Sequence, residues 1–167
     1  MATQDRAGYS ALQISLHWAV VVLIAFQYLF SEGIEQAWRA FARGTSAEGG
    51  LTPLGVAHIV AGVLVLTFAL WRLVLRVRVG APGADPSEPA ALQILAKVTH
   101  FLIYALIILL PISGLVGWVG GVRGAVQAHL MFKTILLPLI GLHVLGALTH
   151  QFFFKTNVLR RMFVPVK

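Results

Sequence analysis

Four long stretches of the chain consist almost entirely of apolar residues, and more polar segments rich in glycine or proline separate them. An α-helix needs about 20 such residues to cross a hydrocarbon layer of about 30 Å. The pattern therefore predicts four membrane-spanning helices at residues 11–30, 53–75, 92–119 and 125–154. Short connections make consecutive helices antiparallel neighbours, so we expect an all-α, integral membrane four-helix bundle. Residues 1–167 are expected to form this single domain.

Local signals predict where the first two helices begin. Ser10 is followed three positions later by Gln13, which is the pattern of a capping box. Thr52 precedes Pro53, and this order is typical of an N-cap followed by the first helical position. The first two helices are therefore expected to start directly after Ser10 and Thr52.

Breaks in the apolar pattern predict bends and loops. Pro111 and Pro138 lie inside the third and fourth helices and should bend them, because proline lacks an N–H and its ring meets the preceding turn. Residues 80–89 contain three prolines and two glycines and are the clearest loop. Residues 31–50 form a polar connection, in which we expect a short surface helix at 34–41.

Composition agrees with a membrane protein and excludes several kinds of site. Hydrophobic residues make up 58% of the chain, charged residues only 11%, and the mean hydropathy is +0.84. Cysteine is absent, which excludes disulfides, iron–sulfur clusters and covalently attached c-type haem. The net charge is +7, but the basic residues flank apolar spans, so nucleic-acid binding is not expected. No small-residue cleavage site follows residues 14–30, so we expect this stretch to be a retained helix.

The distribution of basic residues predicts the orientation in the membrane. With the N-terminus inside, the inner side carries nine basic residues: Arg6, Arg72, Arg76, Arg78, Lys97, Lys155, Arg160, Arg161 and Lys167. The outer side then carries four: Arg39, Arg43, Arg123 and Lys133. The positive-inside rule therefore favours both termini in the cytoplasm.

Histidine provides the main functional signal. All six histidines lie within or at the edge of an apolar span: His17, His58, His100, His129, His143 and His150. A single histidine in a membrane often only bonds a neighbouring helix. Six histidines in four spans with almost no acidic partner favour a bound group.

Helix geometry sorts four of these histidines by depth. His129 and His143 are fourteen residues apart, which is about 21 Å of rise and about 40° short of four full turns, so both face the same direction. His17 lies about two turns into a helix that starts inside, and His58 lies about two turns into one that starts outside. We therefore expect His17 to meet His143 near the inner face, and His58 to meet His129 near the outer face.

Two imidazoles that face one another across a gap suit the axial ligation of a haem, whose potential such ligands help to set. Glycines that could admit a porphyrin, or that serve only close helix packing, are Gly55, Gly62, Gly114, Gly117, Gly141 and Gly146. A zinc or copper site is the alternative, although no carboxylate stands beside the pairs and H-x-x-x-H spacing is missing.

Several segments fall in the order and spacing of one known family: YSALQISLHW at 9–18, His58 through WRLVLR at 71–76, Tyr104 through LPISG at 110–114, and GLH at 141–143 through LTH at 148–150, followed by Lys155, Asn157 and Arg161-Met162. Over residues 9–162 the chain resembles the bacterial cytochrome b561 family, and most closely its small stand-alone members of the superoxide oxidase type. The connection between Trp118 and Gln127 is shorter than in those members.

The resemblance implies two haem b groups, the inner one ligated by His17 and His143 and the outer one by His58 and His129. His150 matches a position associated with bound ubiquinone, and His100 is grouped with it; a hydrogen bond between His100 and His150 is the alternative. The implied function is a diheme b-type cytochrome of the bacterial inner membrane that transfers electrons between a periplasmic donor, such as superoxide, and ubiquinone.

Two functions remain open. As a superoxide:ubiquinone oxidoreductase, the protein would draw a small anion to its outer cations, of which Lys133 carries most weight because it lies one turn after His129. These cations could equally be interfacial residues or partners of haem propionates. The other function is that of an electron-carrier or anchor subunit in a multi-subunit dehydrogenase or hydrogenase. The expected partners are the lipid membrane, ubiquinone and a small anionic donor, and a homo-oligomer is compatible with the sequence.

Overall fold

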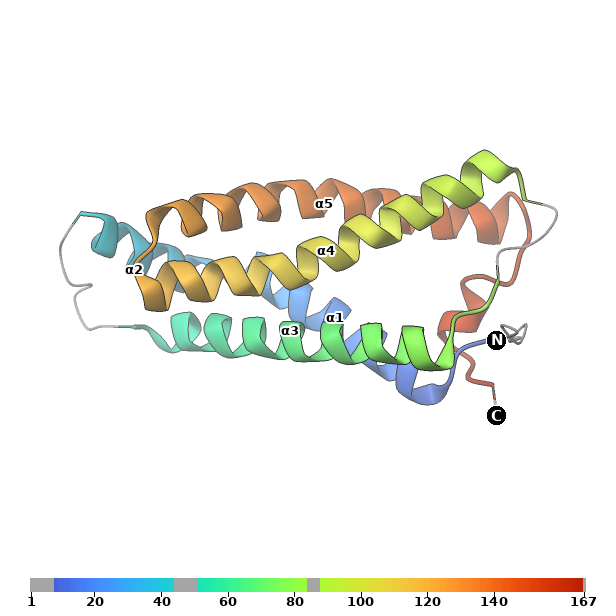
Figure 1. Cartoon of the computed structure of the whole chain (residues 1–167), viewed down its shortest axis with the longest axis horizontal. Helices are drawn as coiled ribbons and strands as arrows, with labels where there is room; N and C mark the ends of the chain where they lie inside the picture. The colour runs from blue at the N-terminus through green and yellow to red at the C-terminus, as the bar shows by residue number, and fades with distance from the viewer. Residues whose placement is uncertain (1–7, 44–50, 84–87, 167) are drawn as a thin grey trace.

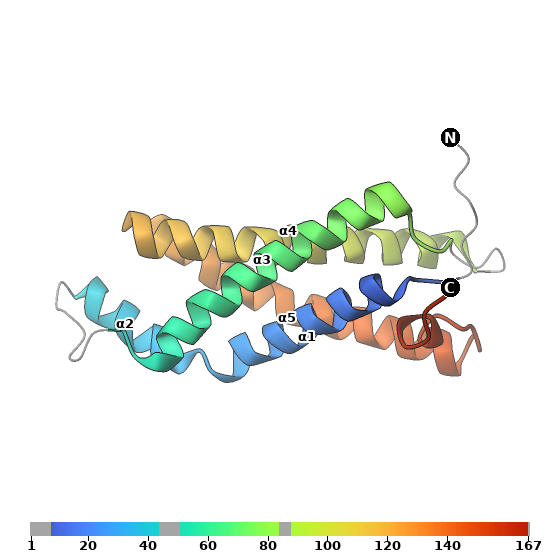
Figure 2. The same ribbon diagram turned by 90° about the horizontal axis from the view of Figure 1, so that it is seen from below.

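The computed structural model describes residues 8–43, 51–83 and 88–166, without the side chains of residues 41 and 42. These residues form five helices and one 3₁₀ turn: α1 (Ala11–Leu29), α2 (Glu32–Ala42), α3 (Pro53–Val79), α4 (Ala90–Gly120), α5 (Arg123–Phe152) and η1 (Arg160–Met162). The four long helices run up and down along one axis (Figure 1). Both termini lie at one end of this bundle, and α2 lies at the other (Figures 1 and 2). We call these the termini end and the α2 end.

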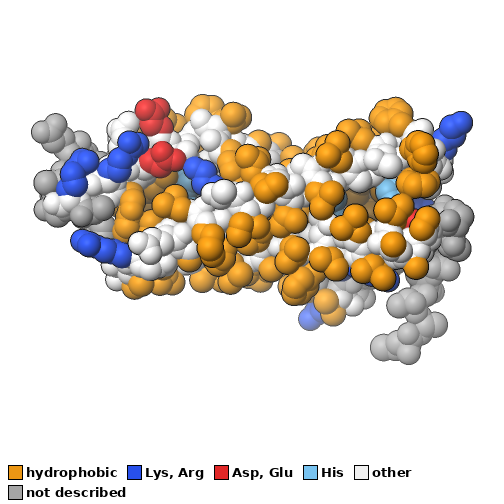
Figure 3. All heavy atoms as spheres, turned by 90° about the horizontal axis from the view of Figure 1, so that it is seen from above, with side chains coloured by type: hydrophobic (Ala, Val, Ile, Leu, Met, Phe, Trp, Pro, Cys, Tyr) orange, Lys and Arg blue, Asp and Glu red, His pale blue; other side chains and the backbone are white. Residues whose placement is uncertain are grey.

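The predicted four-helix membrane bundle is confirmed, since α1, α3, α4 and α5 are each long and apolar enough to cross a membrane. Only 6 to 22% of the most apolar window of each helix is buried inside the protein, so most of that apolar surface faces outward. Apolar side chains cover the middle of the bundle, and charged side chains gather toward its ends (Figure 3). This distribution suits a bilayer, where only helices with internally satisfied backbones can face lipid.

The predicted helix starts are found at α1 and α3. The amide of Gln13 donates to Ser10 Oγ at 3.3 Å, and the amide of Ser10 donates to Gln13 Oε1 at 3.0 Å. Thr52 Oγ1 accepts the amide of Gly55 at 3.1 Å. Both caps satisfy amides that have no partner within the helix.

Several helix ends differ from the sequence expectation by a few residues. α3 continues beyond residue 75 and ends at Val79, where Gly80 adopts a φ of 86° that favours glycine. The expected surface helix is α2, and it begins already at Glu32. α4 and α5 are separated only by Gly121 and Val122, and Gly121 takes a left-handed φ of 65°. Both helices continue without a break through their internal prolines.

A buried apolar layer fills the middle of the bundle. Its centre is Leu136 on α5, which is 1% exposed and lies seven residues after His129 and seven before His143. The other buried members come from α1, α3 and α4: Val20, Val65, Ala69, Leu106 and Ile107. The layer therefore separates the histidines of the two ends.

The C-terminal segment packs against the start of α1. Trp18 Nε1 donates to the carbonyl of Met162 at 2.8 Å, and the ring of Phe163 lies 4.9 Å from the ring of Trp18. The amide of Val166 donates to the carbonyl of Tyr9 at 3.0 Å. Of the basic residues used for the orientation, Arg6 and Lys167 lie outside the described residues.

Candidate functional site

Two pairs of histidines face one another across the bundle, one pair toward each end. At the termini end, the rings of His17 on α1 and His143 on α5 have centroids 6.4 Å apart and planes at 63°. Toward the α2 end, the rings of His58 on α3 and His129 on α5 are also 6.4 Å apart, with planes at 58°. The structure thus brings together the four histidines in the two pairs that helix depth predicts.

The spacing within each pair fits a metal held between two imidazoles. Nitrogen ligands of a first-row metal lie about 2.0 to 2.1 Å from it, and a linear arrangement then places the ring centroids about 6 Å apart. The 6.4 Å in both pairs matches this geometry. The buried Nδ1 atoms of His17 and His58 have no hydrogen-bond partner among the described residues. The donor set therefore fits a haem iron in each pair.

A backbone carbonyl orients His129. Its Nδ1 lies 2.8 Å from the carbonyl oxygen of Leu110 on α4, and a neutral imidazole that donates there has Nε2 free as a ligand. Gly114, one turn further along α4, allows this close approach. A Cβ at position 114 would lie 3.1 Å from His129 Nδ1.

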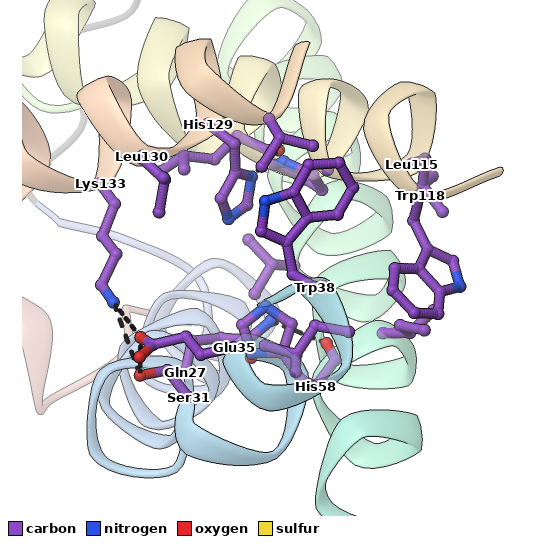
Figure 4. Close-up of a pocket in the computed structure, with 18 of the residues that line it drawn as sticks. Gln27, Ser31, Glu35, Trp38, His58, Leu115, Trp118, His129, Leu130 and Lys133 are labelled. Carbon is purple, nitrogen blue, oxygen red and sulfur yellow. Dashed lines mark hydrogen bonds and ion pairs between the residues drawn. The ribbon is translucent and has the colours of Figure 1, made fainter. Parts of the chain in front are cut away.

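A cavity of about 420 Å³ opens between His58 and His129 at the α2 end (Figure 4). Its walls come from all five helices and include the indole rings of Trp38 and Trp118. Gly62 and Gly114 belong to the same walls. The volume falls within the range of about 300 to 1,000 Å³ that is typical of pockets for organic ligands. The α2-side pair therefore has space between its rings and an opening beside them.

Lys133 stands at the edge of this cavity and is paired with a carboxylate. Its ammonium lies 3.2 Å from Glu35 Oε1 on α2, and Ser31 Oγ donates to the same carboxylate at 2.8 Å (Figure 4). The hydrogen bond from Ser31, followed by that from Lys133, holds the pKa of Glu35 below its ordinary value. Arg39 also approaches Glu35, at 3.8 Å. Lys133 is thus a partly neutralised cation, and Glu35 is a site residue that the sequence did not single out.

The two remaining histidines lie at the termini end with different partners. The ring of His100 on α4 is 5.0 Å from the ring of His143, and its Nδ1 lies 2.6 Å from the carbonyl oxygen of Ala96. His150 Nε2 lies 3.0 Å from Glu88 Oε1, in the segment before α4. His100 therefore packs beside a candidate ligand, whereas His150 is joined to a carboxylate that sequence reasoning missed.

The described residues give no support to a zinc or copper site. Among residues 8–43, 51–83 and 88–166, no three His, Cys, Asp or Glu side chains come close enough to hold a metal ion by themselves. A tetrahedral protein site needs at least three such ligands. Paired imidazoles suit a metal whose other ligands come from a macrocycle.

The glycines that could admit a porphyrin differ in their surroundings. A Cβ at Gly117 would clash with Val126, and one at Gly55 would lie 3.0 Å from Leu51, so these two serve close packing. A Cβ at Gly141 or Gly146 would meet no atom within 4 Å among the described residues. Of the six glycines, Gly62 and Gly114 are the ones that line the cavity at the α2 end.

Sequence comparison agrees with this geometry. The family profile described as prokaryotic cytochrome b561 matches residues 8–165, which is nearly the whole chain. The chain belongs to this family. A cytochrome b562 of Cereibacter sphaeroides is 34% identical over 166 residues, covering 96% of this chain and 98% of the relative.

Two further relatives are more distant members of the same group. A probable superoxide oxidase, CybB, of Yersinia pestis is 29% identical over 176 residues, covering 92% of this chain and 94% of the relative. Cytochrome b561 homolog 1 of Escherichia coli is 26% identical over 177 residues, covering 92% and 96%. Together with the four spans, family membership makes this chain a bacterial membrane electron carrier of the b-type haem class.

Proposed function

We propose that the protein is a diheme b-type cytochrome that carries electrons from a small anionic donor, such as superoxide, at the α2 end to ubiquinone at the termini end. The observation that supports it best is the repetition of one geometry: two histidine pairs, each with centroids 6.4 Å apart, toward opposite ends of one membrane bundle. A single haem would need only one such pair.

The proposed ligands are His17 with His143 and His58 with His129. Haem, when bound, supplies a one-electron carrier whose potential depends on its axial ligands and surroundings. Imidazoles on both sides leave no open position for dioxygen. His129 is oriented by its bond to the Leu110 carbonyl.

The spacing between the two pairs suits transfer along the bundle. His129 and His143 are separated by about 21 Å of helix rise. The apolar layer around Leu136 occupies the space between them. That layer keeps water out of the region that the electrons cross.

The α2 end is proposed as the donor side. Its described charged residues include Arg39, Arg43, Arg123 and Lys133, against the carboxylates of Glu32 and Glu35. This excess of positive charge favours the approach of a small anion. The relative described as a probable superoxide oxidase supports superoxide as the donor.

The termini end is proposed as the acceptor side, in the cytoplasmic half of the membrane. The basic residues assigned there by the positive-inside rule support this orientation. His150 offers a ring nitrogen that can hydrogen-bond a quinone carbonyl and exchange a proton. His100, packed on His143, is the second residue proposed for this side.

Two measurements test the proposal: the number of haems per chain, and which haem is lost when each histidine is replaced. The purified protein should contain two non-covalent haems per chain by pyridine haemochrome assay, both with low-spin bis-histidine spectra. His58→Ala and His129→Ala should remove the same haem, and His17→Ala and His143→Ala the other. One haem per chain, or a haem shared between His17 and His129, would contradict the assignment.

Turnover tests the donor and the acceptor. The purified protein alone should reduce a soluble ubiquinone when it is supplied with superoxide. Obligatory co-purification with an iron–sulfur subunit, together with no reaction toward superoxide, would instead indicate a carrier subunit of a larger complex.

A further inference from the structure

A buried contact joins a carboxylate to His150 at the termini end. Glu88 precedes α4, and its Oε1 lies 3.0 Å from His150 Nε2 on α5. The side chains of His150 and Glu88 are 16% and 8% exposed, respectively. The Nδ1 of His150 and the Oε1 of Glu88 are both buried and have no hydrogen-bond partner among the described residues, so the two side chains meet at ion-pair distance and not in a hydrogen bond. Histidine and acidic surface lie close together in a hollow near this end of the bundle (Figure 3).

The position of Glu88 separates it from the other acidic side chains that the structure describes. Glu32 and Glu35 are both on α2, at the opposite end of the bundle. Within the described residues, Glu88 is therefore the carboxylate of the termini end. The segment that carries it is also held by its backbone, since the Glu88 carbonyl accepts from Gln93 Nε2 at 3.0 Å. This bond uses the backbone of Glu88, and the side-chain carboxylate is left to contact His150.

We propose that Glu88 is a positioning residue for quinone reduction and acts through His150; the inference rests on the proposed function. The negative charge beside Nε2 of His150 favours a proton on that nitrogen, and so favours the tautomer whose Nδ1 is free for the quinone. It also supplies the counter-charge that a buried imidazolium needs. A carboxylate beside a histidine is a common way to position a histidine that acts as a general acid.

The reaction balances with groups already named. Two superoxide anions, one ubiquinone and two protons give two dioxygen molecules and one ubiquinol, and the two electrons arrive one at a time. The Nδ1–H of the imidazolium passes to the quinone oxygen that faces His150, and the opposite oxygen takes its proton from cytoplasmic water. This leaves the neutral Nε2–H tautomer, whose Nε2 lies beside the Glu88 carboxylate. A proton from cytoplasmic water then restores the imidazolium.

Glu88→Gln in the haem-loaded protein is the decisive variant, because Gln keeps the size and shape of the side chain beside His150 Nε2 while the charge is lost. We expect the maximal rate of haem reoxidation by a soluble ubiquinone to fall by about 10- to 100-fold. This is less than the roughly 10²- to 10⁴-fold contributed by a group that itself transfers the proton, because Glu88 acts only through His150. The quinone concentration at half-maximal rate should change little, and the solvent isotope effect in D₂O should rise. Glu88→Asp, which keeps the charge, should recover part of the rate.

Controls separate a chemical role from a structural one. Glu32→Gln makes the same substitution at an exposed carboxylate of the α2 end and should leave reoxidation unchanged. Haem content and both midpoint potentials should be the same in Glu88→Gln as in the wild type. In a His150→Ala background, Glu88→Gln should cause no further slowing, because the two residues act as one unit.

A second measurement does not depend on turnover. In the reduced, diamagnetic protein labelled with ¹⁵N-histidine, the resonances missing in His150→Ala belong to His150, and they should show a protonated Nε2. If Nδ1 carries the proton and Nε2 carries none, the inference is overturned. This test uses the protein with Glu88 intact, so it still decides if Glu88→Gln loses its haems and cannot be used for kinetics.

The kinetic outcomes distinguish this inference from the proposed function. If Glu88→Gln is reoxidised at the wild-type rate, or if it slows reoxidation equally in the presence and absence of His150, the role of Glu88 is refuted and the proposed function is not. Wild-type reoxidation in His150→Ala would refute the quinone site itself, and the inference with it.

Discussion

Gly114→Ala tests the α2-side haem site through a residue that touches no iron. The added Cβ would lie 3.1 Å from Nδ1 and 3.2 Å from Cε1 of His129. Optimal contacts between carbon atoms are about 3.5 to 4.0 Å, so the ring has to move by a few tenths of an ångström. That movement strains the 2.8 Å contact between His129 Nδ1 and the Leu110 carbonyl. The substitution therefore disturbs both the position and the orientation of the ligand.

The size of the effect follows from the role of that carbonyl. Loss of a group that orients a metal ligand typically lowers affinity by about 10- to 100-fold. The free energy of haem binding at this site should thus weaken by about 1.4 to 2.7 kcal/mol. The other proposed haem is assigned to His17 and His143, beyond the apolar layer, and should be retained.

Haem-to-protein ratio and low-temperature electron paramagnetic resonance measure the outcome. Gly114→Ala should lose part of one haem and shift the ferric low-spin signal of that haem, while the second signal stays. Gly124→Ala is the matched control, since a Cβ there meets no atom within 4 Å among the described residues. Two unchanged signals in Gly114→Ala, or loss of the haem at the termini end, would refute the reasoning.

Three further predictions follow from other contacts. Glu35→Gln removes the carboxylate that neutralises the cationic edge of the cavity, so superoxide should react faster at low salt and with a steeper dependence on ionic strength, whereas Glu32→Gln should change both less. Because the pKa of Glu35 is lowered, its carboxylate stays charged from about pH 6 to 8. The difference in superoxide reaction rate between Glu35→Gln and the wild type should therefore be constant over that range, and a difference that vanishes toward about pH 6 would contradict this. His150→Ala should keep both haems and their reduction by superoxide but slow reoxidation by a soluble ubiquinone in stopped-flow measurements; loss of a haem would show that His150 is a ligand. Trp18→Phe removes the hydrogen bond to Met162, worth about 1 kcal/mol, and limited proteolysis should then cut the C-terminal segment faster, with unchanged kinetics arguing that this bond does not hold it.

The bundle and the pairing of its histidines could be predicted from the sequence because both depend on regular helix geometry. Apolar length fixes each crossing, and a rise of about 1.5 Å per residue fixes the depth of each side chain. His129 and His143 therefore had to face one direction at two depths, and the antiparallel order of the helices supplied His58 and His17 at matching levels. The cap at Ser10 was predictable for the same reason, since its pattern is local.

The carboxylate contacts could not be predicted, because they depend on the path of short polar segments. Glu35 reaches Lys133 only because α2 forms part of the cavity wall, and no periodicity encodes the direction that the chain takes after α1. Glu88 reaches His150 from a segment whose sequence indicates only a loop. The extra turn of α3 was also missed, because Arg76 and Arg78 interrupt the apolar pattern there although the helix continues to Val79.

The two ends of the bundle differ in a way that bears on energy conversion. At the α2 end, a solvated cluster around Glu35 and Lys133 borders an open cavity, and the proposed oxidation of superoxide there would release no proton. At the termini end, Glu88 and His150 lie beside one another with little exposure to solvent, and the proposed quinol formation there would consume two protons. Among the described residues, the buried members of the layer around Leu136 are all aliphatic and give protons no group by which to follow the electrons across. Under the proposed function, each electron therefore crosses the membrane without a compensating proton and does work against a potential that is negative inside, at about 2.3 kcal/mol per 100 mV for a full crossing. Turnover in sealed vesicles should accordingly slow as such a potential is applied and recover when an ionophore collapses it.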